Sequence, residues 1–383
     1  MQHPHLSSKL PNVGTTIFTV MSQLAAEHGA INLSQGFPDF SPPERLMDLV
    51  EKFMREGMNQ YAPMMGVPAL REQIAGKVNR LYGAQADPDR EITVTSGATE
   101  ALFVAIQASV QRGDEVIVFD PAYDSYVPAI ELAGGVPVHL PLLPPDYAID
   151  FDRLSHALSS RTQMVIINSP HNPTGSVLSP DDLGQLAELL EGTDTLLLSD
   201  EVYEHIVFDG MEHASCLSIP ALRERSFGVS SFGKTYHNTG WKVGYCVAPP
   251  RLTEEFRKVH QYVTFATTTP MQYALAEFME DASHYLELGD FYAAKRDHFR
   301  SGLEKSRFDI LPCRGTYFQL LGYDRISERP DTEMGRWLTE EIGVAAIPVS
   351  VFYRDRTDTR VLRFCFAKDE FTLNRATAKL KAL

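Results

Sequence analysis

Seven short apolar runs, each ended by turn-forming residues, limit the fold of this chain more than any other feature. They are EITVTSG (91–97), EVIVFDP (115–121), VPVHLPL (136–142), TQMVIINSP (162–170), TLLLSDEVY (195–203), SFGVSSF (226–232) and KVGYCVAP (242–249). Several are apolar on both faces, which is typical of strands in a sheet that helices cover on both sides. Helical patterns such as ATEALFVAIQASV and SPDDLGQLAELL lie between them. The alternation predicts an α/β fold with a seven-stranded, mostly parallel sheet.

The C-terminal part of the chain has a different pattern. An amphipathic helical stretch, FMEDASHYLELGDFYAAKRDHFRSGLEKS, is followed by short strand-like runs in ILPCRGTYFQLLGY, GVAAIPVSVFY and TRVLRFCFAK. We therefore expect a large domain at 45–275 and a smaller α+β domain at 276–383. The segment INLSQGFPDFSPP has neither a helical nor a strand period, and residues 1–44 are expected to join the smaller domain. A chain of 383 residues agrees with two domains, because a single core rarely grows beyond about 250–300 residues.

Composition excludes several classes of partner. Fifty acidic and thirty-five basic residues give a net charge of −15, which disfavours binding to nucleic acid or to an anionic membrane. The start MQHPHLSSKL lacks the apolar run of a signal peptide, and the sequence contains no stretch of 18 apolar residues, so a cytoplasmic protein is expected. The cysteines are too far apart for a zinc motif or a disulfide framework, and no metal site is expected. They are Cys216, Cys246, Cys313 and Cys365.

Polar residues follow the first apolar run in a pattern that suits an anion. Gly97 permits a tight turn, and the backbone N–H groups of Ala98 and Thr99 open the next helical segment. A helix N-terminus of this kind binds a single phosphate. A plain helix cap that uses Thr95 or Ser96 explains the same stretch equally well.

Acidic residues end the fifth run, where ligands of open α/β sheets bind. Asp200, Glu201 and Tyr203 follow TLLLS directly. The carboxylate of Asp200 suits three roles: the magnesium-binding aspartate of a nucleotide hydrolase, the partner of a ring nitrogen, or a helix N-cap. The turn Asn172-Pro-Thr-Gly175 comes after the fourth run and should lie at the same edge of the sheet.

Lys234 has two competing interpretations. The stretch GVSSFGKT (228–235) satisfies G-x-x-x-x-G-K-[ST], the phosphate loop of nucleotide triphosphatases. That loop needs flexible residues before a helix, whereas this one contains VSSF and is followed by YHNTGW, which is poor in helix formers. The alternative is a Schiff base between Lys234 and pyridoxal phosphate. This cofactor needs an amine, an acid at its ring nitrogen, donors at its ring oxygen and partners for its phosphate.

The order of the motifs favours the second interpretation. Asn172-Pro-Thr-Gly175, Asp200 with Tyr203, Ser231-x-x-Lys234 followed by Lys242-Val-Gly-Tyr245, and Arg363 within LRFCFA occur in that order. From about Leu33 to the C-terminus the chain thereby resembles the class I aminotransferases of fold type I. SQGFPDF, NQYAP and GWKVGY are most similar to the kynurenine and glutamine transaminases and the bacterial methionine aminotransferases. The resemblance implies a pyridoxal 5'-phosphate cofactor.

The resemblance also implies roles for the catalytic residues. Lys234 holds the cofactor as the Schiff base and moves the proton between the substrate Cα and the cofactor, which a lysine of lowered pKa can do. Asp200 keeps the ring nitrogen protonated. Asn172 and Tyr203 donate hydrogen bonds to the ring 3-oxygen.

The implied phosphate ligands come from several segments. They are the turn at Gly97 with the N–H groups of Ala98 and Thr99, the Ser231 hydroxyl, Lys242, and Tyr61 from the partner subunit of a homodimer. Lys242 stands where the aspartate branch has an arginine, so it supplies charge without a bidentate fork. Tyr123 is expected to stack on the ring, and a core role is its alternative.

Arg363 is expected to bind the substrate α-carboxylate, with help from Asn172 and the backbone of Gly36. Arg360 is expected at the surface. No second arginine is evident for a side-chain carboxylate, and aromatic residues are available for an apolar wall, although core roles explain them equally. They are Phe18, Phe37, Tyr61, Tyr123, Phe265 and Phe352. This composition favours methionine, aromatic amino acids, kynurenine or glutamine over aspartate.

The sequence therefore predicts an aminotransferase that moves an amino group to a 2-oxo acid by ping-pong kinetics. A β-lyase acting on cysteine S-conjugates would use the same site and release ammonia and pyruvate. A non-enzymatic regulator on this fold usually needs a DNA-binding domain, for which the short N-terminus has no room.

Overall fold

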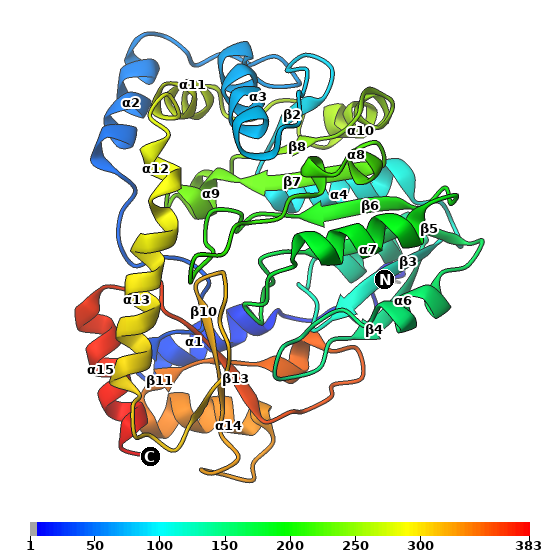
Figure 1. The fold of residues 1–383 in the computed structure, drawn as a ribbon. Coiled ribbons are helices and arrows are strands. Elements are labelled where there is room, and N and C mark those ends of the chain that lie inside the picture. Colours follow the sequence, from blue (N-terminus) through cyan, green and yellow to red (C-terminus); the bar gives the residue numbers. More distant parts are fainter. Residues whose placement is uncertain (1–5) are drawn as a thin grey trace, which may run out of the picture.

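The computed structural model describes residues 6–383, so residues 1–5 of the predicted N-terminal segment lie outside the described residues. All seven apolar runs form strands of one sheet, drawn in the upper part of Figure 1. The strands are β2 (Ile92–Thr95), β3 (Glu115–Asp120), β4 (Val136–Pro141), β5 (Thr162–Asn168), β6 (Leu196–Asp200), β7 (Ser226–Ser231) and β8 (Gly244–Val247). Their order is β2-β8-β7-β6-β5-β3-β4. Strand β8 runs antiparallel to both of its neighbours, and β3 to β7 pair in parallel. The predicted mostly parallel sheet is confirmed.

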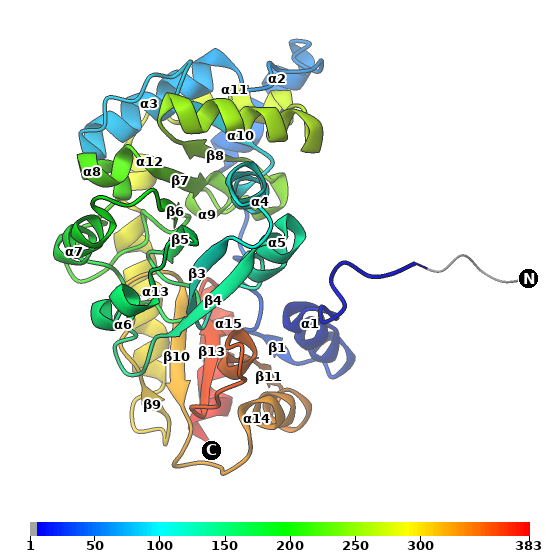
Figure 2. The same ribbon diagram turned by 90° about the vertical axis from the view of Figure 1, so that its right-hand side faces the viewer.

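Helices bury both faces of this sheet, as the two-sided apolar runs predict. Along β3, Ile117 packs into one core, with residues of α3 (Pro68–Tyr82) and α7 (Pro180–Leu190), whereas Val116 and Val118 pack into the other. That second core contains α4 (Ala98–Ser109), α5 (Tyr126–Ala133) and α10 (Pro250–Val263). Figure 2 shows these two layers of helices on opposite sides of the strands.

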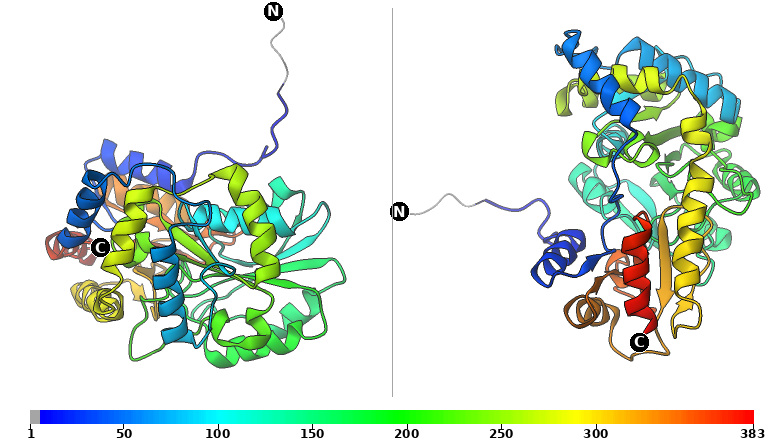
Figure 3. Two further views of the ribbon diagram at one scale, coloured as in Figure 1. Left: turned by 90° about the horizontal axis from the view of Figure 1, so that it is seen from above. Right: turned by 90° about the vertical axis from the view of Figure 1, so that its left-hand side faces the viewer.

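A second sheet and its helices form the lower part of the molecule in Figure 1. The strand order is β12 (Ile347–Pro348), β13 (Val361–Cys365), β10 (Phe318–Gly322) and β9 (Asp309–Ile310), and all pairs are antiparallel. Helices α13 (Leu288–Gly302) and α15 (Glu370–Lys381) lie side by side against it (Figure 3). This part has its own hydrophobic core. The domain boundaries given above remain a prediction.

The N-terminal segment contains a strand that its sequence pattern does not reveal. Strand β1 (Ile31–Asn32) pairs in parallel with β11 (Val344–Ala345). Hydrogen bonds from Ile31 N to Gly343 O (2.9 Å) and from Leu33 N to Ala345 O (3.1 Å) flank this pair. Two residues are too few to show an alternating pattern of apolar and polar residues. This strand forms because its backbone pairs with the edge of β11, which is distant in the sequence. Ile31 and Leu33 pack into the same hydrophobic core as residues of the second sheet.

The remaining helices connect or cover these units. They are α1 (Ile17–Glu27), α2 (Glu44–Arg55), α6 (Phe151–Ala157), α8 (Pro220–Arg223), α9 (Phe232–Thr235), α11 (Thr269–Phe278), α12 (Ser283–Leu286) and α14 (Asp331–Trp337). Within residues 6–383, none of the helices has the length and apolar character needed to span a membrane.

Candidate active site

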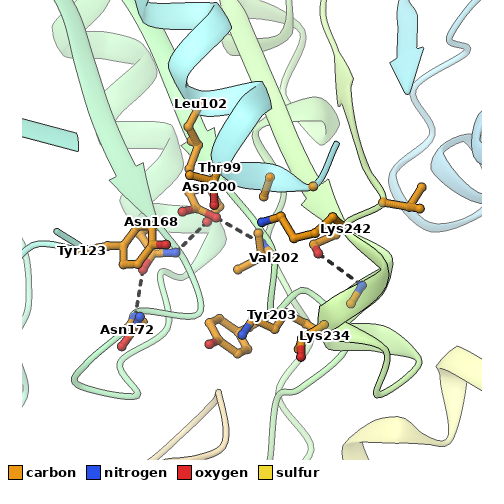
Figure 4. Close-up of a pocket in the computed structure, with 16 residues that line it drawn as sticks. Thr99, Leu102, Tyr123, Asn168, Asn172, Asp200, Val202, Tyr203, Lys234 and Lys242 are labelled. Carbon is orange, nitrogen blue, oxygen red and sulfur yellow. Dashed lines mark hydrogen bonds between the residues drawn. The ribbon is translucent and has the colours of Figure 1, made fainter. Parts of the chain in front are cut away.

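A cavity of about 170 Å³ lies at the carboxyl ends of β5, β6 and β7 and at the N-terminus of α4 (Figure 4). It brings together ten of the predicted site residues: Gly97, Ala98, Thr99, Tyr123, Asn172, Asp200, Tyr203, Ser231, Lys234 and Lys242. Leu102, Asn168, Val202, Gly233, Thr239 and Val243 complete the lining. Residues from segments more than a hundred positions apart thus meet at one edge of the sheet, where ligands of such sheets bind.

Lys242 and the N-terminus of α4 converge on one end of the cavity. The helix has no side-chain cap, and the Thr95 hydroxyl donates to the Gly97 carbonyl oxygen (3.0 Å), so the interpretation of this stretch as a plain cap is wrong. Gly97 has φ +78, and a Cβ atom on it would lie 3.1 Å from Lys242 Nζ. Only glycine allows both this backbone conformation and this close approach. The result is a place where backbone N–H groups and an ammonium can meet one anion.

Lys234 lies on α9, directly after β7. Its Nζ donates hydrogen bonds to Gly36 O (3.0 Å) and to the Tyr317 hydroxyl (2.8 Å), and among the described residues no carboxylate pairs with it. Burial lowers the pKa of Lys234 to about 8. The amine therefore loses its proton far more readily than an exposed lysine.

The phosphate-loop interpretation of residues 228–235 is wrong. Residues Gly228 to Ser231 belong to β7 and pair residue by residue with β8, while β6 pairs with its other side. The backbone N–H groups of this stretch are thus part of a sheet, and α9 ends at Thr235. The Ser231 side chain accepts a hydrogen bond from Gly233 N (3.2 Å), which leaves its own O–H available to a ligand.

Asp200 ends β6 and is buried, and no cation of residues 6–383 forms an ion pair with it. The Tyr126 hydroxyl donates to its Oδ2 (2.6 Å). Burial raises the pKa of Asp200 to about 6, although the hydrogen bond from Tyr126 acts in the opposite direction. No helix begins at this residue, so a helix N-cap role is wrong. Since burial disfavours the charged form of this carboxylate, a cationic partner that enters the cavity would stabilise it.

Asn168 links two of the predicted residues. Its Nδ2 donates to Asp200 O (2.8 Å), and its Oδ1 accepts from Asn172 N (2.8 Å), as Figure 4 shows. The turn that carries Asn172 is thereby fixed to the end of β6. Tyr203 lies near them, and its ring centroid is 5.5 Å from Lys234 Nζ. Burial raises the pKa of Tyr203, which keeps this hydroxyl protonated as a donor.

Arg363 on β13 points at the same turn. Its guanidinium donates to Asn172 Oδ1 (2.8 Å) and to Ser34 O (3.0 Å), while its Nε has no partner among the described residues. The side chain is buried, and its Cζ lies 3.9 Å from the ring centroid of Phe318, 5.2 Å from that of Phe18 and 5.7 Å from that of Phe352. A carboxylate bound here would be surrounded by aromatic rings.

Comparison with known proteins decides the family. The family model "Aminotransferase class I and II" matches residues 28–380. The chain belongs to this family of aminotransferases. Methionine aminotransferase of Escherichia coli K12 is 55% identical to it over 377 residues, which cover 98% of both proteins. Kynurenine–oxoglutarate transaminase of Dictyostelium discoideum is 34% identical, over 98% of this chain and 96% of that protein.

Solved structures agree with this assignment. The crystal structure of YbdL from Escherichia coli, which is described as identifying a methionine aminotransferase function, has a TM-score of 0.98 and 54% identity, and the match covers 100% of both chains. A mutant aspartate aminotransferase of Thermus thermophilus has a TM-score of 0.91 and 29% identity, over 99% of this chain and 100% of that one. The predicted family and the predicted fold type I architecture of this aminotransferase are confirmed.

Of the predicted site residues of the aminotransferase, Gly36, Tyr61 and Arg363 lie outside the cavity lining. Tyr61 is 84% exposed, and its ring contacts Phe265, which is also exposed. Phe37 is exposed beside Lys368. Arg360, expected at the surface, is partly exposed and pairs with Asp324.

Among the residues around the cavity that were not predicted individually are Asn168, Tyr126 and Tyr317. Asn168 is the last residue of β5, and its position at a strand end was a usable signal. Tyr126 lies in AYDSY, the same stretch as Tyr123, which was predicted to stack on the cofactor ring. Tyr317 precedes β10 in the second sheet, and nothing in its local sequence connects it with Lys234.

Proposed function

We propose that this aminotransferase holds pyridoxal 5'-phosphate on Lys234 and transfers the amino group of methionine, aromatic amino acids, kynurenine or glutamine to a 2-oxo acid in two half-reactions. The observation that carries the proposal is one cavity with a buried amine of lowered pKa and a buried acid of raised pKa. Groups with oppositely perturbed pKa values in one cleft are typical of acid–base catalysis. When bound, the cofactor supplies an aldehyde and an electron sink for charge at Cα.

The donors at one end of the cavity suit the phosphate of this cofactor. Ala98 and Thr99 offer backbone N–H groups, Ser231 offers a hydroxyl, and Lys242 offers a positive charge beside Gly97. These groups stabilise a dianion without a bidentate arginine.

The opposite end suits the ring. Asp200 would hold a proton on the ring nitrogen, because an ion pair there relieves the cost of its buried carboxylate. Asn172 accepts from Arg363 through Oδ1, so its Nδ2 is available to donate to the ring oxygen. Tyr203, protonated in its buried position, is the second donor, and Tyr123 lines the cavity where a ring can stack.

Lys234 and Arg363 would act on the substrate. Arg363 binds the α-carboxylate together with Asn172 and the Gly36 backbone, which fixes the direction of the Cα–H bond. Lys234 accepts that proton on Nζ and returns it, since its pKa of about 8 lies close to neutral pH.

The substrate class follows from the surroundings of Arg363. Three aromatic rings lie within 6 Å of its guanidinium carbon, and the cationic residues of the cavity lining are Lys234 and Lys242. An apolar substrate side chain is therefore favoured over a carboxylate. The 55% identity to a methionine aminotransferase supports methionine as the first donor to test.

A homodimer is part of the proposal. Tyr61 and Tyr262 are 84% and 88% exposed, and Val263 and Phe265 are exposed near them. An apolar patch of this kind usually marks an interface. Tyr61 would reach the phosphate of the partner subunit, and sedimentation velocity should give a dimer that Tyr61→Asp weakens.

The function is tested by absorption spectra of the purified enzyme with single amino acids and no acceptor. We expect methionine and aromatic donors to bleach the cofactor band. In Lys234→Ala the rate of this bleaching in a single turnover should fall by at least about 100-fold, as the loss of a general base predicts. Lys258→Ala, an exposed lysine paired with Glu255, is the control. Bleaching by aspartate alone would refute the substrate class, and release of ammonia and pyruvate from a cysteine conjugate would indicate a β-lyase.

A further inference from the structure

The amine of Lys234 is held by two oxygen atoms from outside the large sheet. Gly36 O lies 3.0 Å from Nζ and belongs to the N-terminal segment, while the Tyr317 hydroxyl lies 2.8 Å from it and precedes β10. The same hydroxyl donates to Gly36 O (2.5 Å), which closes a triangle. We propose that Tyr317 is a positioning residue, which together with Gly36 O holds the amine of Lys234 and directs its lone pair into the cavity whenever this amine is released.

The direction of the hydrogen bonds carries this inference. The single proton of the Tyr317 hydroxyl is used by Gly36 O, so the oxygen presents only lone pairs to Lys234. Gly36 O also only accepts. A neutral amine has two N–H groups and one lone pair, and these two acceptors satisfy both N–H groups. The lone pair then remains for the proton of the substrate Cα, which is the orientation that a general base needs.

The surroundings fix the Tyr317 hydroxyl in place. The side chain is fully buried, and its ring packs against Tyr203, Phe318 and Tyr292 with centroid distances of 5.2, 4.9 and 5.5 Å. Thr316, directly before it, has φ +65, a strained conformation for a threonine. Backbone strain of this kind persists where the structure overdetermines it, often at functional sites.

The strained turn is tied to the segment that carries Tyr203. Thr316 N donates to Ile206 O (2.9 Å), and Gly315 pairs with Val207 in an isolated bridge. A Cβ atom on Gly315 would lie 2.7 Å from Pro170 Cβ, so only glycine permits this contact. Tyr317 therefore keeps its place relative to Tyr203 and Lys234, although the second sheet supplies it.

The positioning role of Tyr317 rests on the function proposed above. The test therefore measures the protonation of Lys234 and not turnover, so that the two proposals can fail separately. The full chain without cofactor is acetylated with a trace of acetic anhydride across pH 6–11, and mass spectrometry gives the labelling midpoint of Lys234. For the wild type we expect a midpoint near pH 8. Tyr317→Phe removes an acceptor that stabilises the ammonium, so the midpoint should fall by about one pH unit.

Tyr292→Phe is the matched control. Tyr292 is also buried and packs against Tyr317, but its hydroxyl bonds to His237 Nδ1 (3.0 Å) and not to Lys234. It should leave the midpoint unchanged. An unchanged midpoint in Tyr317→Phe, or an equal shift in both variants, would overturn the proposal. Neither result bears on transamination, which the amino-donor spectra test separately.

A crystal structure of the wild-type enzyme soaked with an amino-acid donor tests the same point without a variant. Release of Lys234 should place Nζ within hydrogen-bond distance of both Gly36 O and the Tyr317 hydroxyl. An amine turned away from both oxygen atoms would refute the proposal, even if Tyr317→Phe failed to fold.

Discussion

Two buried lysines of this aminotransferase differ in how their charge is met. Lys77 on α3 lies 2.6 Å from Glu204 Oε1 and 2.7 Å from the Tyr245 hydroxyl. In the part of the chain that the structure describes, the hydrogen-bond partners of Lys234 are two uncharged oxygen atoms, Gly36 O and the Tyr317 hydroxyl. The first lysine forms a complete ion pair inside the protein, whereas the second keeps a charge that a ligand can still neutralise.

The two acids show the same contrast, although they lie four residues apart. Burial alone would raise the pKa of Glu204, but the ammonium of Lys77 and the hydrogen bonds from Lys77 and Ser230 outweigh it and lower that pKa. Burial raises the pKa of Asp200 to about 6, because its partner Tyr126 is neutral. The charges of Lys77 and Glu204 thus neutralise each other, whereas Lys234 and Asp200 are each buried without an opposite charge in contact. The second arrangement costs stability, which is common in active sites.

The largest expected effect comes from breaking the complete pair. Lys77→Met leaves Glu204 buried without its cation, and the hydrogen bonds from Tyr82, Ser230 and Tyr245 cannot replace that charge. We expect the free energy of unfolding to fall by about 3–5 kcal/mol, measured by urea denaturation at pH 7.

The double variant Lys77→Met with Glu204→Gln is the control. It removes the unpaired carboxylate, so a large part of the lost stability should return. A loss below about 1 kcal/mol in Lys77→Met would mean that the pair does not stabilise the fold and that the contrast between the two lysines is wrong.

The second lysine should respond with the opposite sign. The pKa of Lys234 falls from 10.5 to about 8 on folding, so the unfolded chain binds more protons between these values and stability rises with pH there. In the cofactor-free chain at pH 7, Lys234→Met should therefore increase the free energy of unfolding by up to about 3 kcal/mol. The gain should shrink as the pH rises from 8 toward 10.5 and disappear above 10.5, where the lysine is neutral in both states.

Thermal and urea unfolding of both cofactor-free proteins across pH 6–10.5 measure this difference. The Tyr317 hydroxyl can still donate to Gly36 O in the variant, so no buried oxygen is left without a partner. A variant as unstable as Lys77→Met would show that Lys234 stabilises the fold instead.

The sequence predicted the large sheet and most of the cavity because both follow from local patterns. Each strand of the sheet is an apolar run, and Asn172, Asp200 and Lys234 come directly after such runs, so a parallel sheet brings them to one edge. The family motifs then supplied their roles.

The missed features depend on contacts between distant segments. Tyr317 reaches Lys234 because Thr316 adopts a positive φ and binds Ile206 O, which no periodicity reveals. Strand β1 exists only because β11 offers its edge. The ion pair of Lys77 joins residues 127 positions apart, and a helical lysine gives no sign of burial on its own.

The smallest expected effect concerns the hydrogen bond that the Tyr126 hydroxyl donates to Asp200. This hydrogen bond favours the charged carboxylate, so Tyr126→Phe should raise the pKa of Asp200 above its value of about 6. A higher pKa in the folded variant destabilises it relative to the wild type at pH values above that pKa, and the difference vanishes at a pH where the carboxyl is protonated in both folded proteins. The free energy of unfolding that Tyr126→Phe loses should therefore be about 1 kcal/mol larger at pH 8 than at pH 4.

Tyr353→Phe is the matched control, since the Tyr353 hydroxyl is also buried but donates to the neutral Leu142 O (3.0 Å). Its loss should be the same at both pH values, and an equally flat profile for Tyr126→Phe would show that Asp200 is already protonated at pH 8, which would exclude it as the acid that meets a cationic ring.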